Sequence, residues 1–210
     1  MSDLSLSRTL DPVDYAAFAK ELAIVDRYDN SDHHPHRRWE YALTLHAIGR
    51  WSQMRERRVR GPLYDVGGAG SHLAHMLTDW TECAVEVIDP RVSRSLDQEV
   101  VAGSPLADVV TCISVIEHIF DVDRFLYHLS CLVAPGGLLV LTMDYWNECG
   151  PDLAHFHNMR QRIYCPQTYA QLRAACEPYH LTTFGGLDPT WHGAHVYEYT
   201  FASLVLEKRP

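Results

Sequence analysis

The chain has 210 residues, of which 47% are hydrophobic, so it can bury one sizeable core. Its formal net charge of −9 makes a nucleic-acid partner unlikely, because nucleic-acid-binding proteins usually carry positive charge. No apolar run approaches the ~18 residues of a membrane span, and the first ten residues lack the basic and apolar regions of a signal peptide.

The six cysteines are scattered along the chain and form no C-x-x-C pair. A zinc or redox-active site would need closer spacing. We therefore predict reduced thiols, several of them in the core, and a cytoplasmic protein with no membrane association.

Residues 12–60 have apolar positions at helical spacing, and the polar, histidine-rich segment Asp29 to Pro35 interrupts them. The pattern changes after residue 60, where short apolar runs alternate with the helical stretches Ser71–Leu77, Phe125–Leu132 and Thr168–Cys176. The apolar runs are residues 63–66, 84–88, 109–115, 138–143, 181–184 and 197–206. This alternation predicts an α/β fold with a doubly wound, mostly parallel sheet, in which the last two runs can form an antiparallel hairpin.

The first of these runs ends in Asp65 and a glycine-rich loop, Gly67-Gly68-Ala69-Gly70. A dinucleotide-binding loop would have the spacing G-x-G-x-x-G, but Leu73 stands where its last glycine would be. A carboxylate at the strand end would also repel a phosphate and suits a cationic ligand. Asp89 ends the second run, where its carboxylate could accept hydrogen bonds from two neighbouring hydroxyl groups.

Four stretches together resemble the class I S-adenosylmethionine (SAM)-dependent methyltransferases of the small-molecule group. They are residues 63–71, similar to D-x-G-x-G-x-G, then 87–89, 107–118 and 134–141. The resemblance implies a Rossmann-like fold with a seven-stranded sheet whose last strand is antiparallel. It also implies two parts, an N-terminal helical cap over the acceptor (residues 1–60) and a SAM-binding core (residues 61–210).

SAM carries an ammonium, a sulfonium and no phosphate, which agrees with a carboxylate beside the loop. By resemblance, Asp65 and the loop hold the methionine moiety, Asp89 the ribose, and residues 114–116 line the methyl-transfer face. The expected cofactor-binding residues are Asp65, Gly67, Gly68, Ala69, Asp89, Pro90, Ser114, Val115 and Ile116. The segment 90–107 is shorter than in the family, so the residue that contacts the adenine stays open.

Methyl transfer to a hydroxyl acceptor needs a base near the donor. His118 is the first candidate, although a histidine there could instead cap the following helix. Glu117 is the second, and Tyr145 could position the acceptor. The cap mixes aromatic and polar residues, as is typical of a pocket wall: Tyr28, His36, Arg37, Trp39 and Tyr41. The acceptor is expected to be a small molecule, because the N/D-P-P-Y/F signature of DNA-adenine and glutamine methylation is missing.

Two alternatives stay open. Residues 114–118 resemble the Glu-x-x-Glu-His motif of metal-assisted methyltransferases that act on RNA or quinone-type hydroxyls. Ser114 replaces the first glutamate and is a poor Mg²⁺ ligand, so we predict no metal. A catalytically silent SAM-binding partner protein would keep Asp65 and Asp89 but lose the acceptor pocket. The sequence leaves the oligomeric state undetermined.

Overall fold

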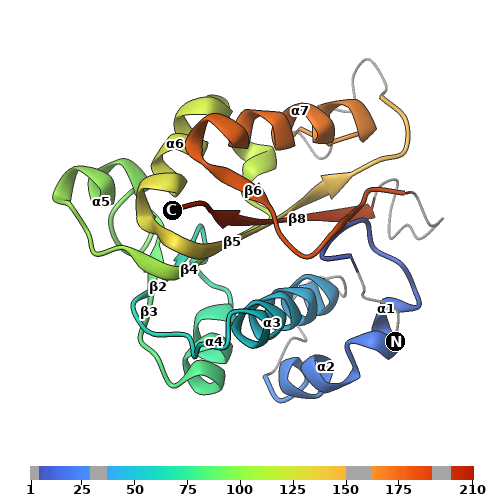
Figure 1. Ribbon diagram of the computed structural model, residues 1–210, viewed down its shortest axis with the longest axis horizontal. Helices are drawn as coiled ribbons and strands as arrows, with labels where there is room; N and C mark the ends of the chain where they lie inside the picture. The colour runs from blue at the N-terminus through green and yellow to red at the C-terminus, as the bar shows by residue number, and fades with distance from the viewer. Residues whose placement is uncertain (1–4, 29–36, 150–161, 191–199) are drawn as a thin grey trace.

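The computed structural model describes residues 5–28, 37–149, 162–190 and 200–210. In these residues the main sheet has six strands in the order β3-β2-β4-β5-β8-β6 (Figure 1). The strands are β2 (Leu63–Val66), β3 (Val85–Ile88), β4 (Ala107–Ile113), β5 (Val133–Tyr145), β6 (Leu181–Thr183) and β8 (Thr200–Lys208). The first four are mutually parallel, and β8 runs antiparallel to both β5 and β6. The predicted fold class is confirmed, including the antiparallel last strand.

The described sheet has one strand fewer than the expected seven, and the difference lies at the β3 edge. Residues 89–106, all of them described, contain no strand and form the helix α5 (Leu96–Ala102). Its N-terminus is fixed by reciprocal hydrogen bonds between Ser95 and Gln98, and Gly103 ends it with a left-handed φ of 69°. The short connection therefore supplies a helix but no further edge strand.

Helices cover both faces of the sheet (Figure 1). On one face lie α3 (Arg37–Met54) and α4 (Leu73–Thr81), with the small helices α1 (Asp14–Ala17) and α2 (Ala19–Val25) beside α3. The other face carries α5, α6 (Val122–Leu132), α7 (Pro166–Cys176) and the 3₁₀ turn η3 (Glu177–Tyr179). Each face has its own apolar core, because β4, β5 and β8 are buried on both sides.

The N-terminal segment is anchored to α3. Asp14 is fully buried, accepts a hydrogen bond from Trp39 Nε1 at 2.9 Å and pairs with Arg8 at 3.0 Å. Arg8 itself belongs to the short strand β1 (Ser7–Arg8), which pairs with β7 (Leu187–Asp188). The helices predicted in residues 12–60 are thus present, whereas the predicted break at 29–35 lies outside the described residues.

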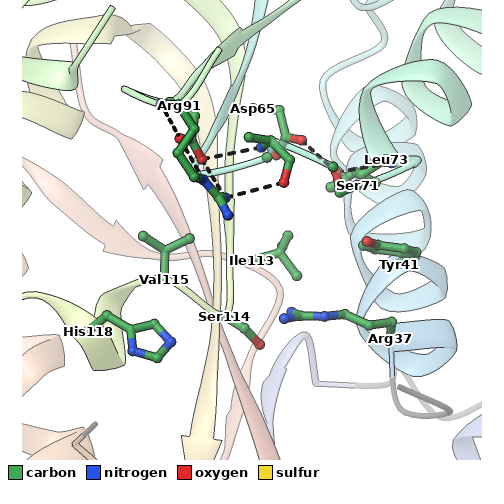
Figure 2. A pocket seen from close by; sticks show the side chains of 15 residues that line it. Arg37, Tyr41, Asp65, Ser71, Leu73, Arg91, Ile113, Ser114, Val115 and His118 are labelled. Atoms are coloured by element: carbon green, nitrogen blue, oxygen red, sulfur yellow. Dashed lines mark hydrogen bonds and ion pairs between the residues drawn. The ribbon is translucent and has the colours of Figure 1, made fainter. Parts of the chain in front are cut away.

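The register of the parallel strands brings their carboxyl ends together. Asp65 in β2 pairs with Val87 in β3 and with Thr111 in β4. The loops after these three strands therefore start from one edge of the sheet and face α3, as Figure 2 shows. In parallel α/β sheets this edge is where ligands bind. No helix in the described parts of the chain is long and apolar enough to cross a membrane.

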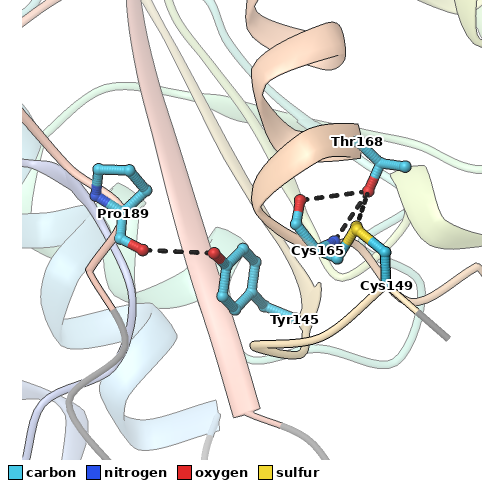
Figure 3. Close-up of a disulfide and its surroundings, with 5 residues drawn as sticks. All are labelled: Tyr145, Cys149, Cys165, Thr168 and Pro189. Carbon is cyan, nitrogen blue, oxygen red and sulfur yellow. Dashed lines mark hydrogen bonds between the residues drawn. A yellow bond between two sulfur atoms is a disulfide. The ribbon is translucent and has the colours of Figure 1, made fainter.

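The expectation of six reduced cysteines is wrong. Cys149, just after β5, forms a disulfide with Cys165 at the start of α7, with their Cα atoms 5.3 Å apart (Figure 3). The pair is 16 residues apart in sequence, so only the tertiary fold brings the two thiols together. Cys83, Cys112, Cys131 and Cys176 are free.

Thiol counting tests this disulfide. Protein purified and denatured without reductant should show four reactive thiols, and six after reduction. Cys149→Ser should show five without reductant and should lose about 3 kcal/mol of stability, because the bond restricts a loop of this length in the unfolded chain. Six thiols in the unreduced wild-type protein would contradict the bond.

Candidate functional site

A cavity of about 510 Å³ opens where the loops after β2, β3 and β4 face α3 (Figure 2). Its described wall comes from α3, the glycine-rich loop and the ends of the strands. The lining residues are Arg37, Tyr41, Asp65, Gly67, Gly68, Ala69, Gly70, Ser71, Leu73, Asp89, Arg91, Ile113, Ser114, Val115 and His118.

Two glycines of the loop have no room for a side chain. A Cβ on Gly67, which has a φ of 78°, would lie 2.3 Å from Val115 Cγ2. A Cβ on Gly68 would lie 2.0 Å from the carboxylate of Asp65. The loop backbone therefore packs directly on the strand ends, and a ligand in the cavity can approach that backbone closely.

Asp65 is a buried carboxylate, with 1% of its surface exposed. Thr111 Oγ1 donates to its Oδ1 at 2.8 Å, and Ser71 Oγ donates to its Oδ2 at 3.3 Å. Burial raises the pKa of Asp65 to about 6, since the low-dielectric surroundings disfavour the charged form and the two hydroxyls offset this only in part. A cationic ligand in the cavity would stabilise the ionised carboxylate.

Asp89 lies beside the glycine-rich loop, where its Oδ2 accepts from the N–H of Ala69 at 3.3 Å, and it is bound by Arg91. The guanidinium donates to both carboxylate oxygens, from Nε at 3.0 Å and from Nη2 at 2.8 Å, and Nη2 also reaches the carbonyl of Ala69 at 3.2 Å. These hydrogen bonds lower the pKa of Asp89, so it stays ionised. The Arg91 side chain is 70% exposed, whereas that of Asp89 is 5% exposed. If the guanidinium moves away, the carboxylate keeps the hydrogen bonds that it accepts from the backbone N–H groups of Ala69 and Arg91.

Arg37, Ser114 and His118 form the cavity wall farthest from Arg91 (Figure 2). Ser114 has a left-handed φ of 49°, and its Oγ donates to Glu40 Oε1 at 2.6 Å. Arg37 Nη1 donates to the other oxygen of Glu40 at 3.1 Å. Burial, together with the charge of Arg37, lowers the pKa of His118, so its imidazole is neutral at neutral pH and can accept a proton.

Most of the predicted site residues meet in this cavity. Those on its wall are Asp65, Gly67, Gly68, Ala69, Asp89, Ser114, Val115 and His118. Of the pocket wall predicted in the N-terminal helices, Arg37 and Tyr41 line the cavity, while Trp39 is buried against Asp14. Tyr28 instead donates to Asp79, and His36 lies outside the described residues.

Four predicted residues are not on the described cavity wall: Pro90, Ile116, Glu117 and Tyr145. Ile116 is fully buried in the core. The hydroxyl of Tyr145 donates to the carbonyl of Pro189 at 3.3 Å (Figure 3). Sequence reasoning missed Arg91, Ser71 and Ile113, although Arg91 stands only two residues after Asp89.

A methyltransferase domain model matches residues 33–183, which is most of the chain. The chain belongs to this methyltransferase family, and the methyltransferase class predicted from its sequence is confirmed. No curated protein sequence matches it.

Solved structures share the fold at low sequence identity. 1,6-Didemethyltoxoflavin-N1-methyltransferase from Burkholderia thailandensis is 16% identical with a TM-score of 0.53, and the match covers 96% of this chain and 92% of that one. A putative sarcosine dimethylglycine methyltransferase from Galdieria sulphuraria is 12% identical with a TM-score of 0.51, covering 99% and 94%. Phosphoethanolamine N-methyltransferase 2 from Haemonchus contortus is 12% identical with a TM-score of 0.47; the match covers 65% of this chain but only 36% of that longer one.

The raised pKa of Asp65 predicts how stability depends on pH. The folded protein holds this proton up to about pH 6, whereas the unfolded chain releases it near pH 3.8, so stability falls as pH rises between these values. Asp65→Asn removes this loss. Relative to the wild type, the free energy of unfolding of this variant should rise between pH 4 and pH 7, by at most about 3 kcal/mol.

Thermal unfolding across this pH range measures the effect. Glu86→Gln is the control, since Glu86 is an exposed carboxylate on β3. If the stability difference between Asp65→Asn and the wild type stays constant from pH 4 to pH 7, then Asp65 does not have a raised pKa in the folded protein.

Proposed function

We propose that this chain binds SAM in the cavity at the ends of β2, β3 and β4 and transfers its methyl group to a nitrogen or oxygen of a small-molecule acceptor. One observation carries the proposal. A single cavity combines a buried carboxylate (Asp65), a strand-end carboxylate (Asp89), a glycine loop without room for side chains, and the segment 114–115.

The residues present fit the chemistry of SAM. Asp65 offers a buried negative charge to a cationic ligand, and Arg37 offers a guanidinium to a carboxylate. Asp89 can accept from the two ribose hydroxyls once Arg91 swings outward. The volume of about 510 Å³ is within the usual range for cofactor sites.

When bound, SAM supplies a methyl group on a positively charged sulfur that is already a good leaving group. The protein then has to align the acceptor, exclude water and remove a proton. His118 is our candidate for the proton acceptor, because its imidazole lines the cavity and is neutral. Tyr145 is a weaker candidate for positioning the acceptor, since its hydroxyl is engaged with Pro189.

The N-terminal helical segment has the role of a cap in this proposal. Its helix α3 contributes Arg37 and Tyr41 to the cavity wall and packs on the sheet through buried residues such as Leu43 and Trp51. The similar Burkholderia thailandensis structure holds 1,6-didemethyltoxoflavin and S-adenosylhomocysteine (SAH), which supports a small-molecule acceptor here.

Binding of SAH tests the cofactor site. Asp89→Ala removes two charge-assisted hydrogen bonds and should weaken SAH binding by about 2–4 kcal/mol. Arg91→Ala frees the carboxylate of Asp89 and should bind SAH at least as tightly as the wild type. Glu86→Ala, on the same strand but exposed, is the matched control. Unchanged affinity of Asp89→Ala in titration calorimetry would refute the ribose assignment.

Turnover should not require a divalent metal. The hydroxyl of Ser114 is engaged by Glu40, and the described residues include no group of three or more His, Cys, Asp or Glu side chains that could hold a metal ion. SAH formation from SAM should therefore survive exhaustive chelation, with the small-molecule fraction of the producing cells as acceptor source. Activity that EDTA abolishes and Mg²⁺ or Zn²⁺ restores would make Glu117 and His118 metal ligands instead.

A further inference from the structure

Three buried carboxyl groups from separate elements act on one another electrostatically near Arg37 and Ser114 of the cavity wall, although they do not form a group that could hold a metal ion. Glu40 belongs to α3, Asp144 to β5, and Glu117 to the 3₁₀ turn η1 (Ile116–His118). Their exposed fractions are 0%, 2% and 2%. We call these three residues the acidic cluster.

Hydrogen bonds fix the backbone at Glu117 and Asp144 and the side chain of Glu40. The N–H of Arg162 donates to the carbonyl of Glu117 at 2.8 Å, and the N–H of Tyr164 donates to the carbonyl of Asp144 at 2.9 Å. The backbone of residues 162–164 thus connects the backbone at Glu117 with the backbone at Asp144. Glu40 Oε1 accepts from Ser114 Oγ and also from Thr142 Oγ1, and Thr142 lies on the same side of β5 as Asp144.

Glu40 has charged and polar partners, whereas the side chain of Glu117 has no hydrogen-bond partner among the described residues. Arg37 donates to Glu40, and its guanidinium is also close enough to act electrostatically on Glu117 and Asp144. Both carboxylate oxygens of Glu117 are buried and have no hydrogen-bond partner among the described residues. A buried carboxyl group without a partner is costly, so its retention here points to a group that it receives from outside.

We propose that Glu117 receives the protonated amine of the acceptor, so that the acceptor is a small amine methylated on nitrogen. This inference rests on the proposed function. Arg37 and Ser114 line the cofactor cavity and also bond Glu40, so the acidic cluster adjoins that cavity. An ammonium group can donate to both of the carboxylate oxygens of Glu117.

The protonation of the acidic cluster agrees with this role. Burial, and then the charge of Asp144, raise the pKa of Glu117 well above its usual range, and burial raises the pKa of Asp144 to about 7. These shifts favour the protonated form of Glu117 in the free protein. When an ammonium group binds, its positive charge would favour the carboxylate, so Glu117 would release its proton to solvent, and the proton that the amine nitrogen loses before methyl transfer would go to His118.

Methylammonium chloride is the simplest probe of this site. Compared with sodium chloride at equal ionic strength, it should raise the melting temperature of the wild-type protein in a saturable way, by about 2–4 °C. Glu117→Gln keeps the shape of the protonated side chain and should lose the shift, while Glu86→Gln should keep it. Glu117→Met serves as a second variant if the glutamine variant does not fold. Equal melting curves of the wild type in the two salts overturn the proposal.

Calorimetry separates this proposal from the proposed function. If the wild type binds neither SAH nor SAM, the cofactor assignment itself fails. If it binds both and Glu117→Gln weakens SAM but not SAH, then Glu117 serves the sulfonium of the cofactor and the amine proposal is overturned. We expect Glu117→Gln to change the two affinities by less than about twofold while it abolishes the methylammonium shift.

Discussion

The carboxylate of Asp65 is the point on which the cavity depends, because both β4 and the loop between β2 and α4 pack against it. Thr111 donates from β4, Ser71 donates from the loop before α4, and Gly68 lies so close that a Cβ there would collide with the carboxylate. The glycine loop can take its shape only over this side chain. Burying the charge costs stability in the empty protein, as the raised pKa indicates. A cationic ligand would recover part of that cost, so the same contact links the fold to binding.

The strand ends and the loop could be predicted because their signals are local. Continuous apolar runs mark strands buried on both faces, and a glycine-rich turn after Asp65 marks the close approach of backbone and ligand. The direction of individual side chains was harder to predict. Val115 faces the cavity, whereas its neighbour Ile116 turns into the core, and the sequence assigned both to the site. The missing edge strand had a local sign in the short 90–107 segment, which forms α5 instead.

Features that join distant residues were not predictable from spacing. The Cys149–Cys165 bond depends on α7 starting beside the end of β5, and no closely spaced pair of cysteines in the sequence indicates it. Glu40 is 74 residues from Ser114, yet its carboxylate accepts the Ser114 hydroxyl. The sequence comparison treated Ser114 as the loss of a carboxylate from this position. The fold instead brings one in from α3, where Arg37, one turn earlier, accompanies it.

The two arginines of the cavity differ in how readily they can leave their acids. Arg91 is 70% exposed, and although its partner Asp89 is buried, that carboxylate also accepts from the backbone N–H groups of Ala69 and Arg91, which remain when the guanidinium leaves. Arg37 is 32% exposed and pairs with the fully buried Glu40. Removing Arg37 would leave a buried charge unpaired, which is far more costly. Binding can therefore open the Asp89 end cheaply, while Arg37 stays in place. Arg37 therefore keeps its pairing with Glu40 while the Asp89 end of the cavity adapts to a ligand.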